Sequence, residues 1–344
     1  MLTRRNLSLL PVATAALAAT ARMAGAQTPT PAAPRDYTEP LGIALEGWPY
    51  PAPVKFLPLT MEGQALRMAY MDIPPTGAAN GRTAVLLHGK NFDSSYWFGP
   101  IQWLTQAGFR VVVPDQIGFN KSSKPDLDYT FEGLSANTVA LLDALQIRTI
   151  VLVGHSTGGM LAVRMASAYP QRVEKLVLED PIGLVDYREF IPPQTTETLL
   201  HVERNYTTET YRAFVAHYFP RLPPAQYEPF VEWRMRITHS GEFERFARAT
   251  ALTYQMIYRG PVRDLYRTLA MPVLLFAGEK DRSFPLIQYA PANKRASLPM
   301  IAAAAKSAAA DLQHGQLVIV PGVGHVPHME APDLFREAFM KFVA

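Results

Sequence analysis

The stretch Gly154-His155-Ser156-Thr157-Gly158 has the pattern Gly-x-Ser-x-Gly and lies between two apolar segments. The run before it, Thr149-Ile-Val-Leu-Val, consists of β-branched and aliphatic residues that are typical of a buried strand. The run after it, Gly159-Met-Leu-Ala-Val-Arg-Met-Ala, has the composition of an apolar helix. Because glycine allows a sharp turn between such a strand and helix, we expect Ser156 to be held at the turn, at the end of the strand.

Further apolar runs of the same kind occur on both sides of this motif, and helical patterns separate them. Continuous aliphatic runs suit parallel strands that are covered on both faces. The alternation predicts an α/β protein with a doubly wound, mostly parallel sheet. The predicted strands are Thr83–Leu87, Arg110–Asp115, Thr149–Gly154, Lys175–Asp180, Pro272–Gly278 and Gln316–Pro321, and the predicted helices include Phe131–Leu145, Met160–Ala168, Ile301–Ala310 and Asp333–Val343.

Two segments break this alternation. Residues 184–267 read as wholly helical and contain 15 of the 36 aromatic residues, so we expect a helical lid inserted into the sheet domain. Residues 27–60 contain eight prolines, which fix φ and remove backbone donors, and we expect an extended arm there rather than a helix or an inner strand. The sheet domain is then predicted to consist of residues 61–183 and 268–344.

The first 26 residues resemble an export signal. Arg4 and Arg5 form a basic start, Leu7–Ala21 is an apolar and small-residue stretch, and Ala24-Gly25-Ala26 fits a small-x-small cleavage site. The sequence Thr3-Arg4-Arg5-Asn6-Leu7 resembles a twin-arginine signal, with an ordinary secretory signal as the alternative. We therefore expect a periplasmic or secreted protein whose signal is bound by the export machinery. After the signal is cleaved, we expect no stable insertion in the membrane.

Composition excludes several classes of site. There is no cysteine, so disulfides, thiolate nucleophiles and cysteine metal sites are impossible. The net charge of +3 comes without a Lys/Arg-rich run, so nucleic acid is not an expected partner. His201, His217 and His239 lack metal-ligand spacing, and no glycine-rich phosphate loop is present. We expect neither a metal nor another cofactor.

From Gln64 onward the chain resembles the α/β-hydrolase superfamily. The resemblance is carried by His88-Gly89, Asp115-Gln-Ile-Gly-Phe, Gly154–Gly159, and the pair Asp281 and His325. In that superfamily the nucleophile, the acid and the histidine follow one another in this order along the chain. The resemblance implies an α/β-hydrolase fold in which Ser156, Asp281 and His325 form a catalytic triad.

Two of these assignments have rivals. His325 lies in a glycine-rich loop after the last predicted strand, whereas His328 lies next to the final helix, where a structural role fits better. Asp281 follows the strand before the last, and Asp180, at the end of the preceding strand, is the alternative acid. A carboxylate in either place could accept the histidine N–H, fix its tautomer and stabilise the imidazolium.

The resemblance also implies an oxyanion hole made of two backbone N–H groups. One belongs to Thr157, directly after the nucleophile, and the other to the loop after His88-Gly89. We expect Lys90 to supply the second donor, with Asn91 as the alternative, and we expect the Lys90 side chain to point to solvent. His88 and Asp115 read as structural residues.

The identity of the expected nucleophile limits the reactions that this chain could catalyse. Dehalogenases and epoxide hydrolases of the superfamily use an aspartate at this turn, whereas a serine forms an acyl-enzyme. Carboxylic ester hydrolysis is the leading hypothesis, with small apolar or aromatic esters as substrates. The alternatives are a carbon–carbon bond hydrolase of the ring-fission type and a non-catalytic binding protein on the same fold. The sequence leaves open the acyl-chain preference and the oligomeric state.

Overall fold

The computed structural model describes residues 37–344. The expected export signal, residues 1–26, and the first ten residues of the expected arm lie outside the described residues.

A single mixed sheet organises the described part of the chain, with the strand order β1-β2-β4-β3-β5-β6-β7-β8. The pairs β1–β2 and β2–β4 are antiparallel, and the other neighbours are parallel. The sheet is therefore mostly parallel, as the sequence predicted. The strands are β1 (Val54–Met61), β2 (Gln64–Ile73), β3 (Thr83–Leu87), β4 (Arg110–Pro114), β5 (Ile150–His155), β6 (Val173–Glu179), β7 (Val273–Gly278) and β8 (Gly315–Val320).

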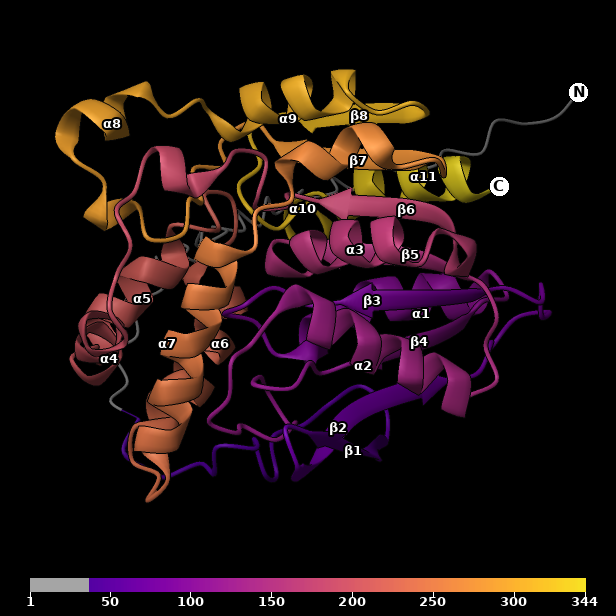
Figure 1. Ribbon diagram of the computed structural model, residues 1–344. Helices are drawn as coiled ribbons and strands as arrows, with labels where there is room; N and C mark the ends of the chain where they lie inside the picture. The colour runs from indigo at the N-terminus through magenta and orange to yellow at the C-terminus, as the bar shows by residue number, and fades with distance from the viewer. Residues whose placement is uncertain (1–36) are drawn as a thin grey trace, which may run out of the picture. The chain divides into compact units, whose positions relative to one another are not determined.

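Both faces of the sheet are covered by helices (Figure 1). Alternate side chains of β5 enter different clusters: Leu152 packs with one and Val151 and Val153 with the other. The first cluster includes residues of α2 (Phe131–Ala144), α3 (Thr157–Ala168) and α9 (Ile301–Ala310), and the second includes residues of α1 (Phe98–Gln106) and α11 (Pro332–Val343). Burial on both faces explains why the strand sequences are continuously apolar.

The sheet begins earlier than the sequence analysis placed it. Strand β1 starts at Val54, inside the segment expected to be a proline-rich arm, and neither β1 nor β2 was predicted as a strand. Strand β1 lies at the edge of the sheet order and alternates in burial rather than being apolar throughout, so its pattern lacks the signal of the inner strands. Pro58 is compatible with this place because an edge strand tolerates a missing backbone donor.

A helical insertion, residues 184–267, separates β6 from β7. Its main elements are α4 (Thr196–Arg204), α5 (Thr208–Ala216), α6 (Pro224–Ile237) and α7 (Phe243–Arg259), with short 3-10 turns at Tyr187–Glu189 and Arg263–Thr268. Helix α4 packs on α7 and α5 packs on α6. Figure 1 shows these helices beyond the carboxyl ends of the parallel strands, which is the edge where β5 delivers Ser156.

The described part of the arm packs on this insertion. Leu41, Ile43 and Leu45 share an apolar cluster with Trp233 and Phe246. The Leu41 N–H also donates to the carbonyl oxygen of Arg236, at 3.1 Å. The arm therefore supports α6 and α7 rather than extending away from the domain.

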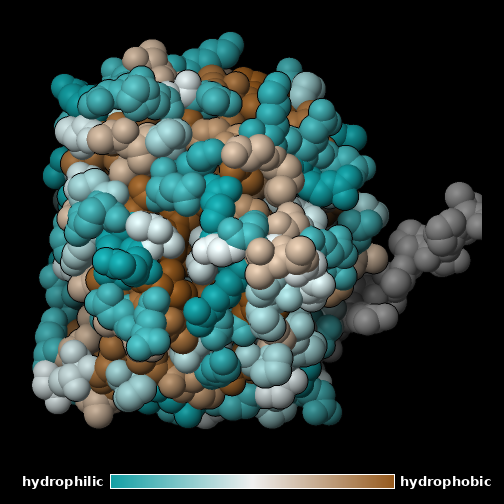
Figure 2. Space-filling view, turned by 90° about the vertical axis from the view of Figure 1, so that its right-hand side faces the viewer, coloured by the Kyte–Doolittle hydropathy of each residue, from teal (hydrophilic) through white to brown (hydrophobic). Residues whose placement is uncertain are grey.

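A second, shorter segment follows β7 and was not anticipated. It contains a 3-10 turn at Ile287–Tyr289 and α8 (Ala292–Ser297) before α9 begins. The remaining short elements are 3-10 turns at Ser94–Trp97 and Pro170–Arg172, and α10 (Pro327–Glu330). Among the described residues, no helix has the length and apolar character needed to span a bilayer. The face in Figure 2 is a mosaic of hydrophilic and apolar residues.

Candidate active site

Ser156 lies at the turn between β5 and α3, in a backbone conformation that non-glycine residues rarely adopt. Its φ is 54° and its ψ is −117°. The turn is tight enough to require glycine on both sides. A Cβ at Gly154 would lie 2.4 Å from the Gly158 carbonyl oxygen, and one at Gly158 would lie 2.3 Å from the Leu87 carbonyl oxygen. The glycines of the motif are thus explained by backbone packing around the serine.

Ser156, His325 and Asp281 form one hydrogen-bonded chain. His325 Nε2 lies 2.9 Å from Ser156 Oγ, and His325 Nδ1 lies 2.8 Å from Asp281 Oδ2. The three residues come from the loops after β5, β8 and β7, which end at the same edge of the sheet. A neutral imidazole placed in this way can take the serine proton, while the carboxylate holds its tautomer.

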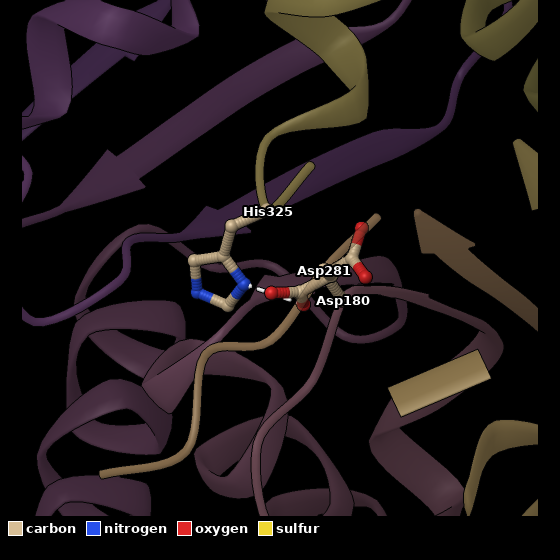
Figure 3. A group of neighbouring side chains, drawn as sticks. All are labelled: Asp180, Asp281 and His325. Atoms are coloured by element: carbon tan, nitrogen blue, oxygen red, sulfur yellow. Dashed lines mark hydrogen bonds and ion pairs between the residues drawn. The ribbon is translucent and has the colours of Figure 1, made fainter. Parts of the chain in front are cut away.

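Asp180 lies beside Asp281 but does not contact the histidine by a hydrogen bond recorded among the described residues (Figure 3). Both Asp180 oxygens accept from the Gly278 N–H, at 2.8 and 3.1 Å. Burial and the neighbouring Asp281 raise the pKa of Asp180 well above its ordinary value. Burial alone would raise the pKa of Asp281 as well, but His325, Ser283 and Asp180 hold it below its ordinary value.

His328, the alternative histidine, is hydrogen-bonded to Glu179 rather than to Ser156 or Asp281. Its N–H and Nδ1 contact Glu179 Oε1 at 2.7 and 2.9 Å, and its ring stacks on Trp97 with centroids 4.5 Å apart. Glu179 is also the last residue of β6, next to Asp180. His328 therefore anchors α10 to the sheet.

Two residues that the sequence analysis did not single out, His155 and Tyr96, together with Tyr218 of the insertion, support Ser156 and His325. His155 Nε2 lies 2.8 Å from the His325 carbonyl oxygen, and its Nδ1 lies 3.0 Å from the Tyr96 hydroxyl, which accepts from the Gly89 N–H at 3.0 Å. Tyr218 of the insertion stacks on the His325 ring with centroids 5.1 Å apart. Burial lowers the pKa of His155 well below its ordinary value, so this brace is a neutral imidazole. The variable position of the motif, residue 155, carried no signal of this role.

The loop expected to supply the second oxyanion donor passes directly against Ser156. A Cβ at Gly89 would lie 3.1 Å from Ser156 Cβ, and Lys90 and Thr157 line the same cavity as Ser156. Asn91, the alternative, lines this cavity too, and its side-chain amide donates to the Tyr218 hydroxyl at 3.0 Å.

The Lys90 side chain does not point to solvent, as the sequence analysis expected. Its Nζ donates to the Thr250 carbonyl oxygen at 2.9 Å and to Thr253 Oγ1 at 2.5 Å, and it lies 4.0 Å from the centroid of the Tyr254 ring. All three partners belong to α7. Burial lowers the pKa of Lys90 to about 7. The solvent prediction was wrong because the insertion covers this loop.

A cavity of about 480 Å³ opens at Ser156. Its size falls within the range of small-molecule sites. Residues 282–289, the segment after Asp281, contribute to its wall together with the insertion. Four of the 15 aromatic residues of the insertion line it, and these are Tyr206, Phe214, Tyr218 and Tyr254. Most of the others are buried among the helices themselves.

His88 and Asp115 hold loops around the site. His88 Nε2 accepts from the Gln116 N–H at 3.1 Å. Asp115 accepts from Ser94 Oγ at 2.5 Å and from the Tyr50 hydroxyl at 2.9 Å.

One grouping of side chains in the described part of the chain has the spacing to hold a metal ion, and it is Asp180, Asp281 and His325, whose donor atoms lie within 4.8 Å of one another. The contacts already described occupy them: both His325 nitrogens are bonded, one to Asp281 and one to Ser156. To bind a metal ion, His325 would have to lose one of these two hydrogen bonds. The three side chains therefore fit a triad better than an ion site.

Comparison with known proteins agrees with the resemblance stated from the motifs. A probable hydrolytic enzyme from Pseudomonas aeruginosa, known from its crystal structure, is 38% identical with a TM-score of 0.87, over 90% of this chain and all of that one. A haloalkane dehalogenase from Mesorhizobium japonicum is 37% identical over 37% of this chain and 36% of its own length.

A third relative is the 2-hydroxy-6-oxo-6-phenylhexa-2,4-dienoate hydrolase of Comamonas testosteroni, 37% identical over 31% of this chain and 39% of its own length. The matches to this enzyme and to the dehalogenase each span little more than a third of the relative. The model of the alpha/beta hydrolase family matches residues 84–338 of this chain. The chain therefore belongs to the alpha/beta hydrolase family.

Proposed function

We propose that this protein is a serine hydrolase that cleaves carboxylic esters through an acyl-enzyme intermediate. The observation that carries the proposal is the chain of contacts from Asp281 through His325 to Ser156, which ends at a cavity. Ser156 Oγ attacks the ester carbonyl while His325 Nε2 takes its proton, and His325 then donates that proton to the departing alcohol. Water, activated by the same imidazole, releases the acid.

The Lys90 and Thr157 N–H groups are the proposed donors to the tetrahedral oxyanion. Thr157 is the first residue of α3, where the unpaired N–H groups and the helix dipole favour negative charge. Removing one donor of this kind typically costs about 10²–10³ in rate. Both donors are backbone groups, so their placement depends on the loops that carry them.

The insertion is proposed to act as a lid that selects small apolar or aromatic esters. Support comes from its aromatic residues in the cavity wall, among them Tyr206, Phe214 and Tyr254, and from the aliphatic side chains of Leu199 and Ile257. Apolar walls with few polar groups favour apolar ligands.

A carbon–carbon bond hydrolase is the second candidate, since one relative of this chain carries the name of such an enzyme. A ring-fission diketone and an aryl ester would separate the two. We expect purified protein to hydrolyse p-nitrophenyl butyrate far faster than a 2-hydroxy-6-oxo dienoate, and Ser156→Ala to lose the ester activity. The reverse preference in the wild-type protein would establish the carbon–carbon reaction instead. Retention of both activities in Ser156→Ala would mean that Ser156 is not the nucleophile. A wild-type protein with neither activity would favour the non-catalytic binding protein.

Export is also part of the proposal, and it rests on Arg4, Arg5 and the apolar stretch that follows. The mature chain should begin near Gln27 and accumulate outside the cytoplasm. Replacing both arginines with lysine should block export by the twin-arginine route. Normal export of that double variant would indicate a general secretory signal.

A further inference from the structure

Asp281, the acid of the candidate triad, has a second carboxyl group beside it, that of Asp180, although a triad needs only one acid. Asp180 follows the last residue of β6 with a φ of 36°, in the left-handed region that aspartate tolerates better than most residues. Asp281 follows β7, the neighbouring strand. Figure 3 shows Asp281 directed at His325 and Asp180 next to it.

The pair is too close and too buried for both groups to be ionised. Their oxygens lie within 4.8 Å of each other, and the two residues are 0% and 2% exposed. Like charges at this distance repel strongly in a medium of low dielectric constant, and a buried carboxylate pair therefore retains one proton. An ionised carboxylate only accepts hydrogen bonds, so a hydrogen bond between the two side chains requires a proton on one of them.

The other contacts decide which residue holds that proton. Asp281 accepts from His325 Nδ1 at 2.8 Å through Oδ2 and from the Ser283 N–H at 2.8 Å through Oδ1. Asp180 receives only the Gly278 N–H among the donors recorded for the described residues. Asp281 has the donors that stabilise a carboxylate, so the proton belongs to Asp180.

No neighbouring group changes this balance. The titratable groups that face the pair from the packed elements are Glu179 on β6, Glu330 on α10, Tyr187 and Tyr218 of the insertion, and His325 itself. Glu179 adds negative charge and is bonded to His328. The histidine that faces His325, His155, is a neutral brace.

We propose that Asp180 is protonated at neutral pH and donates a hydrogen bond to Asp281, so that the pair presents a single negative charge to His325. Asp180 is then a positioning residue that acts through Asp281. The hydrogen bond from Asp180 restrains the Asp281 carboxylate and weakens the attraction between that carboxylate and the imidazolium of His325. This attraction sets the pH at which His325 loses its proton and can act as a base. The pH argument rests on the proposed triad, while the proton on Asp180 does not.

Asp180→Asn is the decisive variant, because an amide keeps the shape and the donor but cannot ionise. We expect its pH profile of kcat/KM to have an acid limb within about 0.3 pH unit of the wild-type limb. Asp180→Leu removes the donor, leaves the full charge on Asp281, and should move the acid limb to higher pH. If Asp180 were ionised in the wild type, Asp180→Asn would remove a charge and move the acid limb down by about one unit, which overturns the proposal.

A second measurement needs no activity. The infrared spectrum of the full-length protein should contain the C=O stretch of a buried protonated carboxyl at neutral pH, and Asp180→Asn should lose it. Persistence of that band in Asp180→Asn, or its absence from the wild type, would contradict the proposal even if the ester hydrolysis is correct. If the band is lost in Asp180→Asn as expected but no ester is cleaved, the proposed ester hydrolysis is wrong and the proposal of a protonated Asp180 is supported.

Discussion

The edge of the sheet and the helical insertion above it make different contributions to the same cavity. At the carboxyl edge of the sheet, Ser156, Asp281 and His325 follow β5, β7 and β8 and are joined by hydrogen bonds. The insertion supplies wall residues from helices that pack mainly on one another, as α4 does on α7. The proposed chemistry therefore depends on the ends of the strands, while the proposed fit of the substrate depends mainly on the insertion.

The largest expected effect is at the sheet edge. Asp281→Asn should lower kcat by about 10⁴-fold, because an amide at this place stabilises the wrong imidazole tautomer. Steady-state kinetics of purified variants measure the loss, with Asp180→Asn as the matched control. A greater loss from Asp180→Asn than from Asp281→Asn would make Asp180 the catalytic acid.

A second prediction concerns rigidity in the two regions. Gly154→Ala places a Cβ 2.4 Å from the Gly158 carbonyl oxygen, and we expect it to lower the free energy of unfolding by about 2–4 kcal/mol. Gly241→Ala, in the insertion, meets no atom within 4 Å and should change that free energy by less than about 1 kcal/mol. Urea unfolding measures both. Equal losses of unfolding free energy in the two variants would contradict the expectation that only the turn at Gly154 requires glycine.

Lys90 links the two regions: it follows Gly89, which lies against Ser156, and its side chain is hydrogen-bonded to α7. Lys90→Met should lower kcat by about tenfold or more with a smaller change in KM, because a displaced oxyanion donor affects the transition state more than substrate binding. Lys55→Met, at an exposed ion pair on β1, is the control and should leave kcat unchanged. A purely KM effect of Lys90→Met would limit Lys90 to substrate binding.

The smallest effect, counted per methylene of the acyl chain, concerns the wall of the cavity. Each further methylene of the acyl chain is worth about 0.8 kcal/mol while the cavity has room, so kcat/KM should rise roughly fourfold per methylene from acetate to butyrate or hexanoate esters and then fall. Phe214→Trp should move the maximum to shorter chains. A steady decline from acetate onward would mean that the aromatic residues close the cavity rather than line it.

The sequence predicted the inner strands and the turn at Ser156 well, and the reason is physical. Strands covered on both faces are continuously apolar, and a sharp strand-to-helix turn demands glycine at Gly154 and Gly158, so both leave local patterns. The antiparallel strands β1 and β2 left no such pattern, because both are partly exposed and their pairing is a property of the folded sheet.

The parts of the site that depend on contacts between distant segments could not be predicted. Lys90 looked like a surface lysine because nothing near it in the sequence indicates that α7, 160 residues later, covers it. The wall formed by residues 282–289 and the brace between His155 and Tyr96 are equally non-local. Choosing between Asp180 and Asp281 required the donors around each carboxyl, which only the folded chain defines.

The central claim is that Ser156 is an activated nucleophile, and labelling with a fluorophosphonate tests it most directly. The reagent should react once per chain, at the peptide that contains Ser156, as read by mass spectrometry. Labelling should be absent from Ser156→Ala and should fall steeply in His325→Ala, which lacks the base. An unlabelled wild-type protein, or a label that persists at another residue in Ser156→Ala, would contradict the account.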